Sequence, residues 1–200
     1  MGELLDDCLG KGNYEIGIDE AAFYGPKLDI QCKNVFGKED TIVTIQIDML
    51  LAKKFGMEYT DSDNTQKTPY IIHRTSLGCY ERTLALLLEK YAGALPLWMS
   101  PNQMTVIPVS EAFDDYAYRV LDLLKAKGFR ADISTGSDTF KYRIREAQLE
   151  KVPYMLIVGA NEAETCSVSV RTRKEGENLG AMSLVDFIAK AEKEINEKAR

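Results

Sequence analysis

Alternating apolar and polar positions dominate residues 14–74 and predict consecutive antiparallel strands. The clearest alternation covers Lys27 to Cys32 and Thr41 to Asp48. Two weaker strands are predicted over Tyr14–Asp19 and Pro69–Arg74. Turns are predicted at Gly37–Asp40 and Asp61–Thr65. These patterns indicate a sheet whose strands follow one another along the chain.

One face of the second predicted strand is polar. Thr44, Gln46 and Asp48 alternate with apolar residues, so their side chains point to the same side. His73, near the end of the last strand, is expected on the same side. The sheet is therefore predicted to carry candidate polar groups on one face.

The second half of the chain alternates between strands and helices, which is typical of a small α/β domain with a mixed sheet. The predicted strands are Met104–Val109, Pro153–Val158 and Ser167–Arg173. The predicted helices run from Phe113 to near Gly128, over Phe140–Lys151, and from Leu184 to Ile195. Two further features are a charged turn at Lys174–Gly180 and a capping box formed by Ser183 and Asp186.

A helix predicted over Leu77–Tyr91 connects these regions, and it is followed by the segment Ala92–Pro101. This segment contains one glycine and two prolines, which break the helical pattern. Its apolar content indicates a packed connector. The domain boundary is placed here, giving residues 1–100 and 101–200.

Composition and cysteine spacing indicate an ordinary globular protein. The apolar fraction is 45% and the charged fraction 28%, and no apolar run approaches the ~20 residues of a membrane span. The N-terminus is acidic and does not resemble a secretory signal. The scattered cysteines Cys8, Cys32, Cys79 and Cys166 predict reduced thiols, so a cytoplasmic location without membrane association is expected.

The net charge of −6 argues against generic binding to nucleic acid, but basic residues cluster locally. The two clusters are Lys141, Arg143, Arg145 and Lys151, and Arg171, Arg173 and Lys174. Such clusters can contact a phosphate backbone. The alternative is solvated charge on a helix and at a strand end.

The segment from Ile71 to Arg82 combines a strand, a glycine-containing turn and the start of a helix, and it holds the single histidine, His73. Arg82 falls in the first turn of the predicted helix, where backbone N–H groups and a guanidinium suit a polyphosphate. The alternative is a buried helix with a surface Glu81–Arg82 pair.

Several motifs in order resemble the C-terminal half of threonyl-tRNA synthetase, a class II aminoacyl-tRNA synthetase. In the first half they are Ala22–Lys27, Thr44–Asp48, Ile72–Arg74 through Glu81–Arg82, and Pro96–Trp98. In the second half they are Tyr142–Glu146, Val152–Leu156 and Val168–Arg173. The resemblance runs from about Tyr14 to the end of the chain.

The resemblance implies an α+β antiparallel-sheet remnant of a class II catalytic domain over residues 1–100. An α/β anticodon-binding domain, with a mixed sheet flanked by helices, follows over residues 101–200. The implied function is ATP-dependent charging of tRNA(Thr) with threonine through a threonyl-adenylate. ATP with Mg²⁺ and a zinc ion are the implied cofactors.

The implied site residues follow from the matching positions. Arg82 would hold ATP, and Tyr24, Gln46 and Cys79 would line the threonine pocket, with Lys27 nearby. A pocket of hydrogen-bonding groups can select a hydroxyl amino acid. Individually, these residues also fit structural roles: a core aromatic for Tyr24 and a solvent-facing strand position for Gln46.

The single histidine His73 matches one of three protein ligands to the zinc ion. Taken alone, it also fits a hydrogen-bonded structural role. The other two ligands have no counterpart in the chain, so zinc binding is expected only if another polypeptide supplies them.

The matching anticodon-reading positions are Ser137, Glu162 and Arg171. A glutamate can accept a hydrogen bond from an exocyclic amine, and an arginine can bond to or stack on an unstacked base. The alternative is a surface charge or loop hydroxyl at each position.

The first two class II motifs have no counterpart in the chain, and half of a catalytic sheet should leave strand edges and an apolar face uncovered. We therefore expect self-association or a separately encoded N-terminal half, and no activity of the chain alone. The alternative function is a tRNA- or protein-binding module without catalysis.

Overall fold

The computed structural model describes residues 2–174 and 177–199, which form two compact units divided between Leu86 and Leu87. The first unit contains the antiparallel strands and the second contains the α/β layers. Within the described ranges, no helix is long and apolar enough to cross a membrane.

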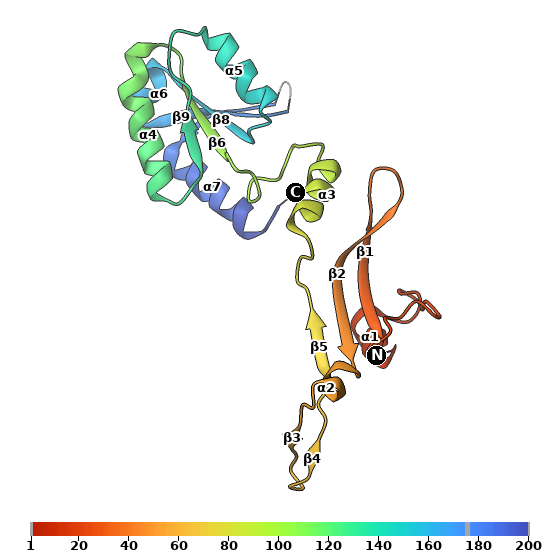
Figure 1. The fold of residues 1–200 in the computed structure, drawn as a ribbon. Helices are drawn as coiled ribbons and strands as arrows, with labels where there is room; N and C mark the ends of the chain where they lie inside the picture. The colour runs from red at the N-terminus through yellow and green to blue at the C-terminus, as the bar shows by residue number, and fades with distance from the viewer. Residues whose placement is uncertain (1, 175–176, 200) are drawn as a thin grey trace. The chain divides into compact units, whose positions relative to one another are not determined.

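A three-stranded antiparallel sheet forms the centre of the first unit, with strand order β1-β2-β5 (Figure 1). The bounds are Lys27–Lys33 for β1, Glu39–Asp48 for β2 and Ile71–Arg74 for β5. Two short helices accompany it, α1 (Gly2–Leu9) and α2 (Leu51–Lys54). The clean alternation in the sequences of β1 and β2 therefore predicted that both strands exist.

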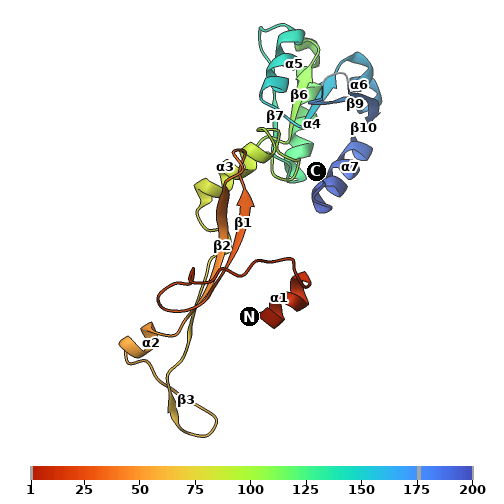
Figure 2. The ribbon, with the colours of Figure 1, turned by 90° about the vertical axis from the view of Figure 1, so that its right-hand side faces the viewer.

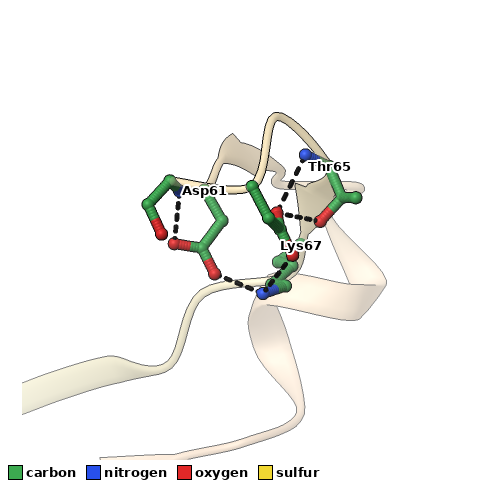
Figure 3. Close-up of polar contacts among 5 residues, drawn as sticks. Asp61, Thr65 and Lys67 are labelled. Carbon is green, nitrogen blue, oxygen red and sulfur yellow. Dashed lines mark hydrogen bonds and ion pairs between the residues drawn. The ribbon is translucent and has the colours of Figure 1, made fainter.

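A small hairpin, β3 (Tyr59–Thr60) and β4 (Gln66–Lys67), extends beyond the end of this sheet (Figures 1 and 2). Two carboxylates hold its turn. Asp63 accepts hydrogen bonds from the Thr65 N–H at 3.0 Å and hydroxyl at 2.6 Å, while Asp61 forms an ion pair with Lys67 (Figure 3). The polar turn residues thus close the hairpin through their own side chains.

Helix α3 (Tyr80–Lys90) begins three residues later than the sequence pattern predicted. Gly78 has φ +59°, a left-handed conformation that ends any continuous helix on its N-terminal side. A Cβ at Gly78 would lie 2.5 Å from the carbonyl oxygen of Ile42, so this glycine also permits close approach to β2. The turn before α3 is consequently fixed against the sheet.

The second unit contains a five-stranded mixed sheet in the order β10-β9-β8-β6-β7. β6 pairs in parallel with β7 and β8, whereas β9 pairs antiparallel with β8 and β10. The strands are β6 (Met104–Pro108), β7 (Ala131–Ile133), β8 (Tyr154–Val158), β9 (Ser167–Thr172) and β10 (Asn178–Ser183). The helices are η1 (Glu111–Phe113), α4 (Asp114–Ala126), α5 (Phe140–Leu149), α6 (Ala160–Thr165) and α7 (Leu184–Asn196).

Helices cover both faces of this sheet, because alternate residues of its central strands enter different apolar clusters. Leu156 of β8 packs in the cluster that contains residues of α4 and α7. Its neighbours Met155 and Ile157 pack with Ile144 and Ala147 of α5. The layered arrangement (Figures 1 and 2) follows from this period of two in fully buried strands.

The antiparallel sheet and the helix-flanked mixed sheet confirm the predicted fold class. The strand predicted over Tyr14–Asp19 is wrong: this segment is irregular, with Asp19 at φ +63°. The elements α1, α2, β3, β4, β7, α6 and β10 were not predicted. The predicted turn Lys174–Gly180 includes residues 175 and 176, which lie outside the described residues, and its last three residues belong to β10.

Candidate functional site

Three residues predicted for the site form one row across the sheet of the first unit. Lys27 of β1 pairs with Gln46 of β2, and Gln46 pairs with His73 of β5. Directly opposite residues in antiparallel strands point to the same face. The period-two pattern therefore places all three side chains on the polar face of the sheet.

Tyr24 joins this row from the loop that precedes β1. Its hydroxyl donates to Oε1 of Gln46 at 2.5 Å, and its ring lies 5.8 Å from the His73 ring between centroids. The loop lies close to β2 because Gly25 has no side chain: a Cβ there would lie 2.0 Å from the carbonyl oxygen of Ile47. The backbone carbonyl oxygen of Tyr24 also accepts a hydrogen bond from the Met49 N–H at 2.9 Å.

The carboxylate of Asp48 contacts the His73 ring. This carboxylate is fully buried, and its Oδ2 lies 3.0 Å from Nε2 of His73. Its Oδ1 accepts the N–H groups of Leu50 and Leu51, both at 2.9 Å. Burial opposes ionisation, but the Leu51 N–H, the His73 ring and the Leu50 N–H outweigh it and lower the pKa of Asp48.

A second carboxylate on the polar face, that of Asp29, binds the ammonium group of Lys27. The two side chains form an ion pair at 2.7 Å, and the Thr44 hydroxyl donates to the other oxygen of Asp29 at 2.8 Å. Burial opposes ionisation of Asp29, but Lys27 and Thr44 lower its pKa, and the same ion pair raises the pKa of Lys27. Lys27, Asp29 and Thr44 thus form one bonded group on the polar face, separate from the Tyr24–Gln46 and Asp48–His73 pairs.

Arg82 and Cys79 lie near the other end of β2. The Nη1 of Arg82 donates to the carbonyl oxygen of Thr41 at 3.2 Å, five positions before Gln46. The exposed thiol of Cys79 donates to Glu81 at 2.9 Å. Among the described residues, no hydrogen bond or ion pair joins Arg82 or Cys79 to the Lys27–Gln46–His73 row.

The residues present do not make a zinc site by themselves. Within residues 2–174 and 177–199, no three His, Cys, Asp or Glu side chains gather as a metal would require. His73 has one carboxylate neighbour, which it contacts through Nε2. Zinc sites in proteins use at least three protein ligands, so the described chain supplies too few.

The three candidate anticodon residues lie at different places on the second unit. Ser137 is exposed in the loop after β7, and Glu162 follows β8, so both lie beyond the carboxyl ends of parallel strands. Glu162 caps α6 by accepting the Gly159 N–H at 3.0 Å. Arg171 lies on β9 opposite Met155, nearer the other end of β8.

Several residues of the two basic clusters serve structural roles. Arg143 is 5% exposed and donates to the Ser134 carbonyl at 2.7 Å. Arg173 donates to the Leu95 carbonyl at 2.6 Å, and Lys151 donates to the Ala92 carbonyl. These contacts fix the connector and the loop after β7, so fewer of these side chains are free to contact a phosphate than the sequence suggested.

The two units match two family models. Residues 4–91 match the tRNA synthetase class II core domain (G, H, P, S and T), and residues 103–194 match the anticodon binding domain. A threonine–tRNA ligase of Clostridium perfringens (strain 13 / Type A) is 59% identical over 177 residues, 88% of this chain and 27% of that protein. One from Clostridium botulinum (strain Eklund 17B / Type B) is 53% identical over 200 residues, all of this chain and 31% of that protein.

The chain belongs to the threonyl-tRNA synthetase family. It spans about 30% of the length of these relatives. The RNA binding domain of threonyl-tRNA synthetase from Cryptosporidium parvum Iowa II has a similar structure, with a TM-score of 0.79 and 36% identity. That match covers 87% of this chain and 44% of the other.

The prolyl-tRNA synthetase of Cryptosporidium parvum shares the fold, with a TM-score of 0.72 at 21% identity over 89% of this chain and 38% of that chain. The sequence reasoning that led to the family did not assign roles to Asp48 and Asp29. The alternation of the strands did contain a signal for both carboxylates, because each lies on the same face as a candidate site residue.

Proposed function

We propose that this chain provides the C-terminal part of a threonine–tRNA ligase. The polar face of the first unit contributes Tyr24, Lys27 and Gln46 to the cleft that binds threonine, with Cys79 at its rim. Arg82 contacts ATP, which binds with Mg²⁺, and the second unit binds tRNA(Thr). Such a protein would work in the cytoplasm.

The observation that carries this proposal is the row Lys27–Gln46–His73, with Tyr24 bonded to Gln46. An amino-acid substrate has an ammonium, a carboxylate and, in threonine, a hydroxyl. The row offers donors and acceptors for all three kinds of group. A site built from such groups discriminates against apolar isosteres, because its polar atoms would be left unpaired.

We further propose that a partner polypeptide completes the cleft, and that the chain alone does not activate threonine. Among the described residues of the first unit, only Asp48 and Ala52 are buried. Its exposed apolar residues include Ile18, Phe23 and Ile72. Such surface is expected to be covered by a partner; a second copy of the chain is one possible partner.

An assay of threonine-dependent exchange between ATP and pyrophosphate tests this proposal. The chain alone should give no signal above a blank. Adding a polypeptide that carries the rest of the family's catalytic domain should restore exchange. In that complex Arg82→Ala should lower the rate about 10²–10³-fold, the usual cost of removing one charge-stabilising donor. Exchange by the chain alone, or none after complementation, would contradict the proposal.

The second candidate function is a tRNA-binding module without catalysis. It is favoured by the distribution of apolar packing: both buried clusters lie between Leu97 and Ala191, within the second unit. This unit can therefore remain folded whatever the first unit does.

Gel-shift measurements at two salt concentrations test RNA binding. Arg171→Ala should weaken binding of tRNA(Thr) by about 1–3 kcal/mol if the guanidinium contacts a base. Lys125→Ala, an exposed change on α4 outside the predicted site, is the matched control and should leave binding unchanged. Equal affinity of the Arg171→Ala variant and the unmodified chain would remove Arg171 from the interface.

A further inference from the structure

A cavity of about 240 Å³ lies within the second unit, at the amino ends of two parallel strands. Gln103 immediately precedes β6 and Arg130 immediately precedes β7, and both residues line the cavity. Ser137 and Glu162 instead follow the carboxyl ends of β7 and β8, and neither lines the cavity. The cavity is therefore separate from these two candidate anticodon residues.

Hydrogen bonds fix the wall that the connector shares with the loop before β7. The Gln103 side chain, in a residue only 2% exposed, donates to the Leu97 carbonyl at 3.0 Å and accepts the Arg130 N–H at 2.9 Å. The Arg130 guanidinium donates from Nε to the Ser100 carbonyl at 2.9 Å and from Nη2 to the Trp98 carbonyl at 3.0 Å. The wall is thus ordered before a ligand arrives, which lowers the cost of binding.

The loop before β7 is also held at the end of α4. Gly128 has φ +84°, and its N–H donates to the Lys125 carbonyl at 2.9 Å. The N–H of Phe129 donates to the Leu124 carbonyl at 3.1 Å, and its ring packs in the apolar cluster that contains residues of α4 and α7. The backbone on both sides of Gly128 is therefore fixed.

The unpartnered polar groups of the lining are mostly hydrogen-bond donors. Among the described residues, no hydrogen bond or ion pair holds the Lys127 ammonium, Arg130 leaves Nη1 unused, and the buried indole N–H of Trp98 lacks an acceptor. Lys198 adds a cation 6.0 Å from the centre of the Trp98 ring. Glu192 is the one carboxylate among the described lining residues. A negatively charged acceptor suits such a lining.

Apolar side chains form the rest of the lining. They are Trp98, Phe129 and Ile195. Two of the three are aromatic, and their rings can pack against the ring of a ligand. Sites for drug-sized ligands measure about 300–1,000 Å³, so this smaller cavity limits its ligand to roughly one ring and one short acidic group.

We propose that this cavity binds a small organic anion, an acidic group carried on a single aromatic ring. The acidic group contacts the Lys127 ammonium and the free Nη1 of Arg130. The ring packs against Trp98 and Phe129. Threonine activation and tRNA binding play no part in this assignment.

The single tryptophan makes binding directly measurable. NMR of the full ¹⁵N-labelled chain gives one indole N–H signal, that of Trp98, beside the backbone amides. Benzoate at neutral pH is the probe. The indole signal and the amides of Lys127, Phe129 and Arg130 should move together and saturate, with half-saturation at about 1 mM for so small a ligand.

Two related probes separate the contribution of the ring from that of the charge. Benzamide has the same ring without the charge and should bind about tenfold more weakly than benzoate, because it loses the charge-assisted hydrogen bonds. Acetate presents the carboxylate of an acidic side chain without a ring. It should also bind more weakly than benzoate, because it buries less apolar surface.

Three charge variants test the lining residues. Lys127→Met should weaken benzoate binding about threefold or more, and Glu192→Gln should strengthen it by removing a like charge. Both residues are exposed, so the fold should be retained. Lys125→Met is the matched control, because Lys125 is an exposed lysine of α4 that does not line the cavity. It should leave the affinity unchanged.

Three results would overturn the proposal. They are the absence of saturable movement with benzoate, an affinity for benzamide or acetate equal to that for benzoate, and equal affinities of Lys127→Met and Lys125→Met for benzoate. The titrations need neither threonine nor tRNA. Their outcome is therefore independent of the exchange assay that tests the proposed function.

Discussion

At the scale of single residues, two glycines determine how loops approach β2. Gly25 and Gly78 each lie so close to a β2 carbonyl that a Cβ would collide with it. The first brings Tyr24 to Gln46, and the second brings the start of α3 to the bulge near Ile42. Site geometry in this unit thus depends on absent side chains as much as on those present.

Gly78→Ala tests this dependence. The substitution combines a left-handed backbone, which costs an L-residue about 1–2 kcal/mol, with a backbone clash. Gly37→Ala is the matched control: its φ is +76°, but nothing lies within 4 Å of the added Cβ. Hydrogen exchange of the β2 amides should accelerate about tenfold or more in Gly78→Ala, and more than in Gly37→Ala. Equal acceleration would show that the clash is relieved without cost.

At the scale of elements, alternation predicted the strands that matter for the site. β1 and β2 were expected from period two, and β5 from an apolar segment that follows a turn. The pairing of the three strands placed Lys27, Gln46 and His73 together. β7 and α6 were missed because three and six residues are too short for a periodic signal. The contacts of Asp48 with His73 and of Asp29 with Thr44 join different strands, and no pattern within one strand contains them.

The β3–β4 hairpin carries a prediction about pH. Lys67 and the Ser62 N–H lower the pKa of Asp61, and the Thr65 hydroxyl and N–H, together with Lys67, lower that of Asp63. Their stabilisation is complete above the ordinary carboxyl value of about 3.9 and is lost as pH falls through the lowered values. Carboxyl-carbon NMR should show both groups titrating below their ordinary range.

Lys67→Met should raise the pKa of Asp61 toward its ordinary value, because the first cause of its shift is removed. Asp63 should move less, since Thr65 dominates there. Lys38→Met, an exposed change in the β1–β2 turn, provides the control. A pKa of Asp61 that is unchanged in Lys67→Met would show that the ion pair does not form in solution.

At the scale of the whole molecule, the two units differ in how they are held together. The second unit has apolar clusters on both faces of its sheet. The first has a hydrogen-bonded sheet with bonded polar groups on one face and two buried residues among those described. Burial of apolar surface supplies most folding free energy, so the first unit should open more readily.

Limited proteolysis of the full chain measures this difference. Cleavage should begin within residues 2–86, and fragments containing residues 104–196 should persist. A partner that covers the first unit should protect it, whereas tRNA should protect the second. Equal resistance of both units in the isolated chain would contradict the expected difference in stability.

The β1–β2 pairing has a consequence for how the sequence tolerates insertions and deletions. The register of this pairing shifts between Ile30 and Gln31. A bulge therefore separates the end of the β1–β2 ribbon at the turn from the end that carries Lys27 and Gln46. A length change confined to residues 34–38 leaves the Lys27–Gln46 pairing intact. Loss of one residue between the bulge and Gln46 would instead turn Gln46 to the opposite face of the sheet. Insertions and deletions should therefore be common at residues 34–38 and absent near the Lys27–Gln46 pairing.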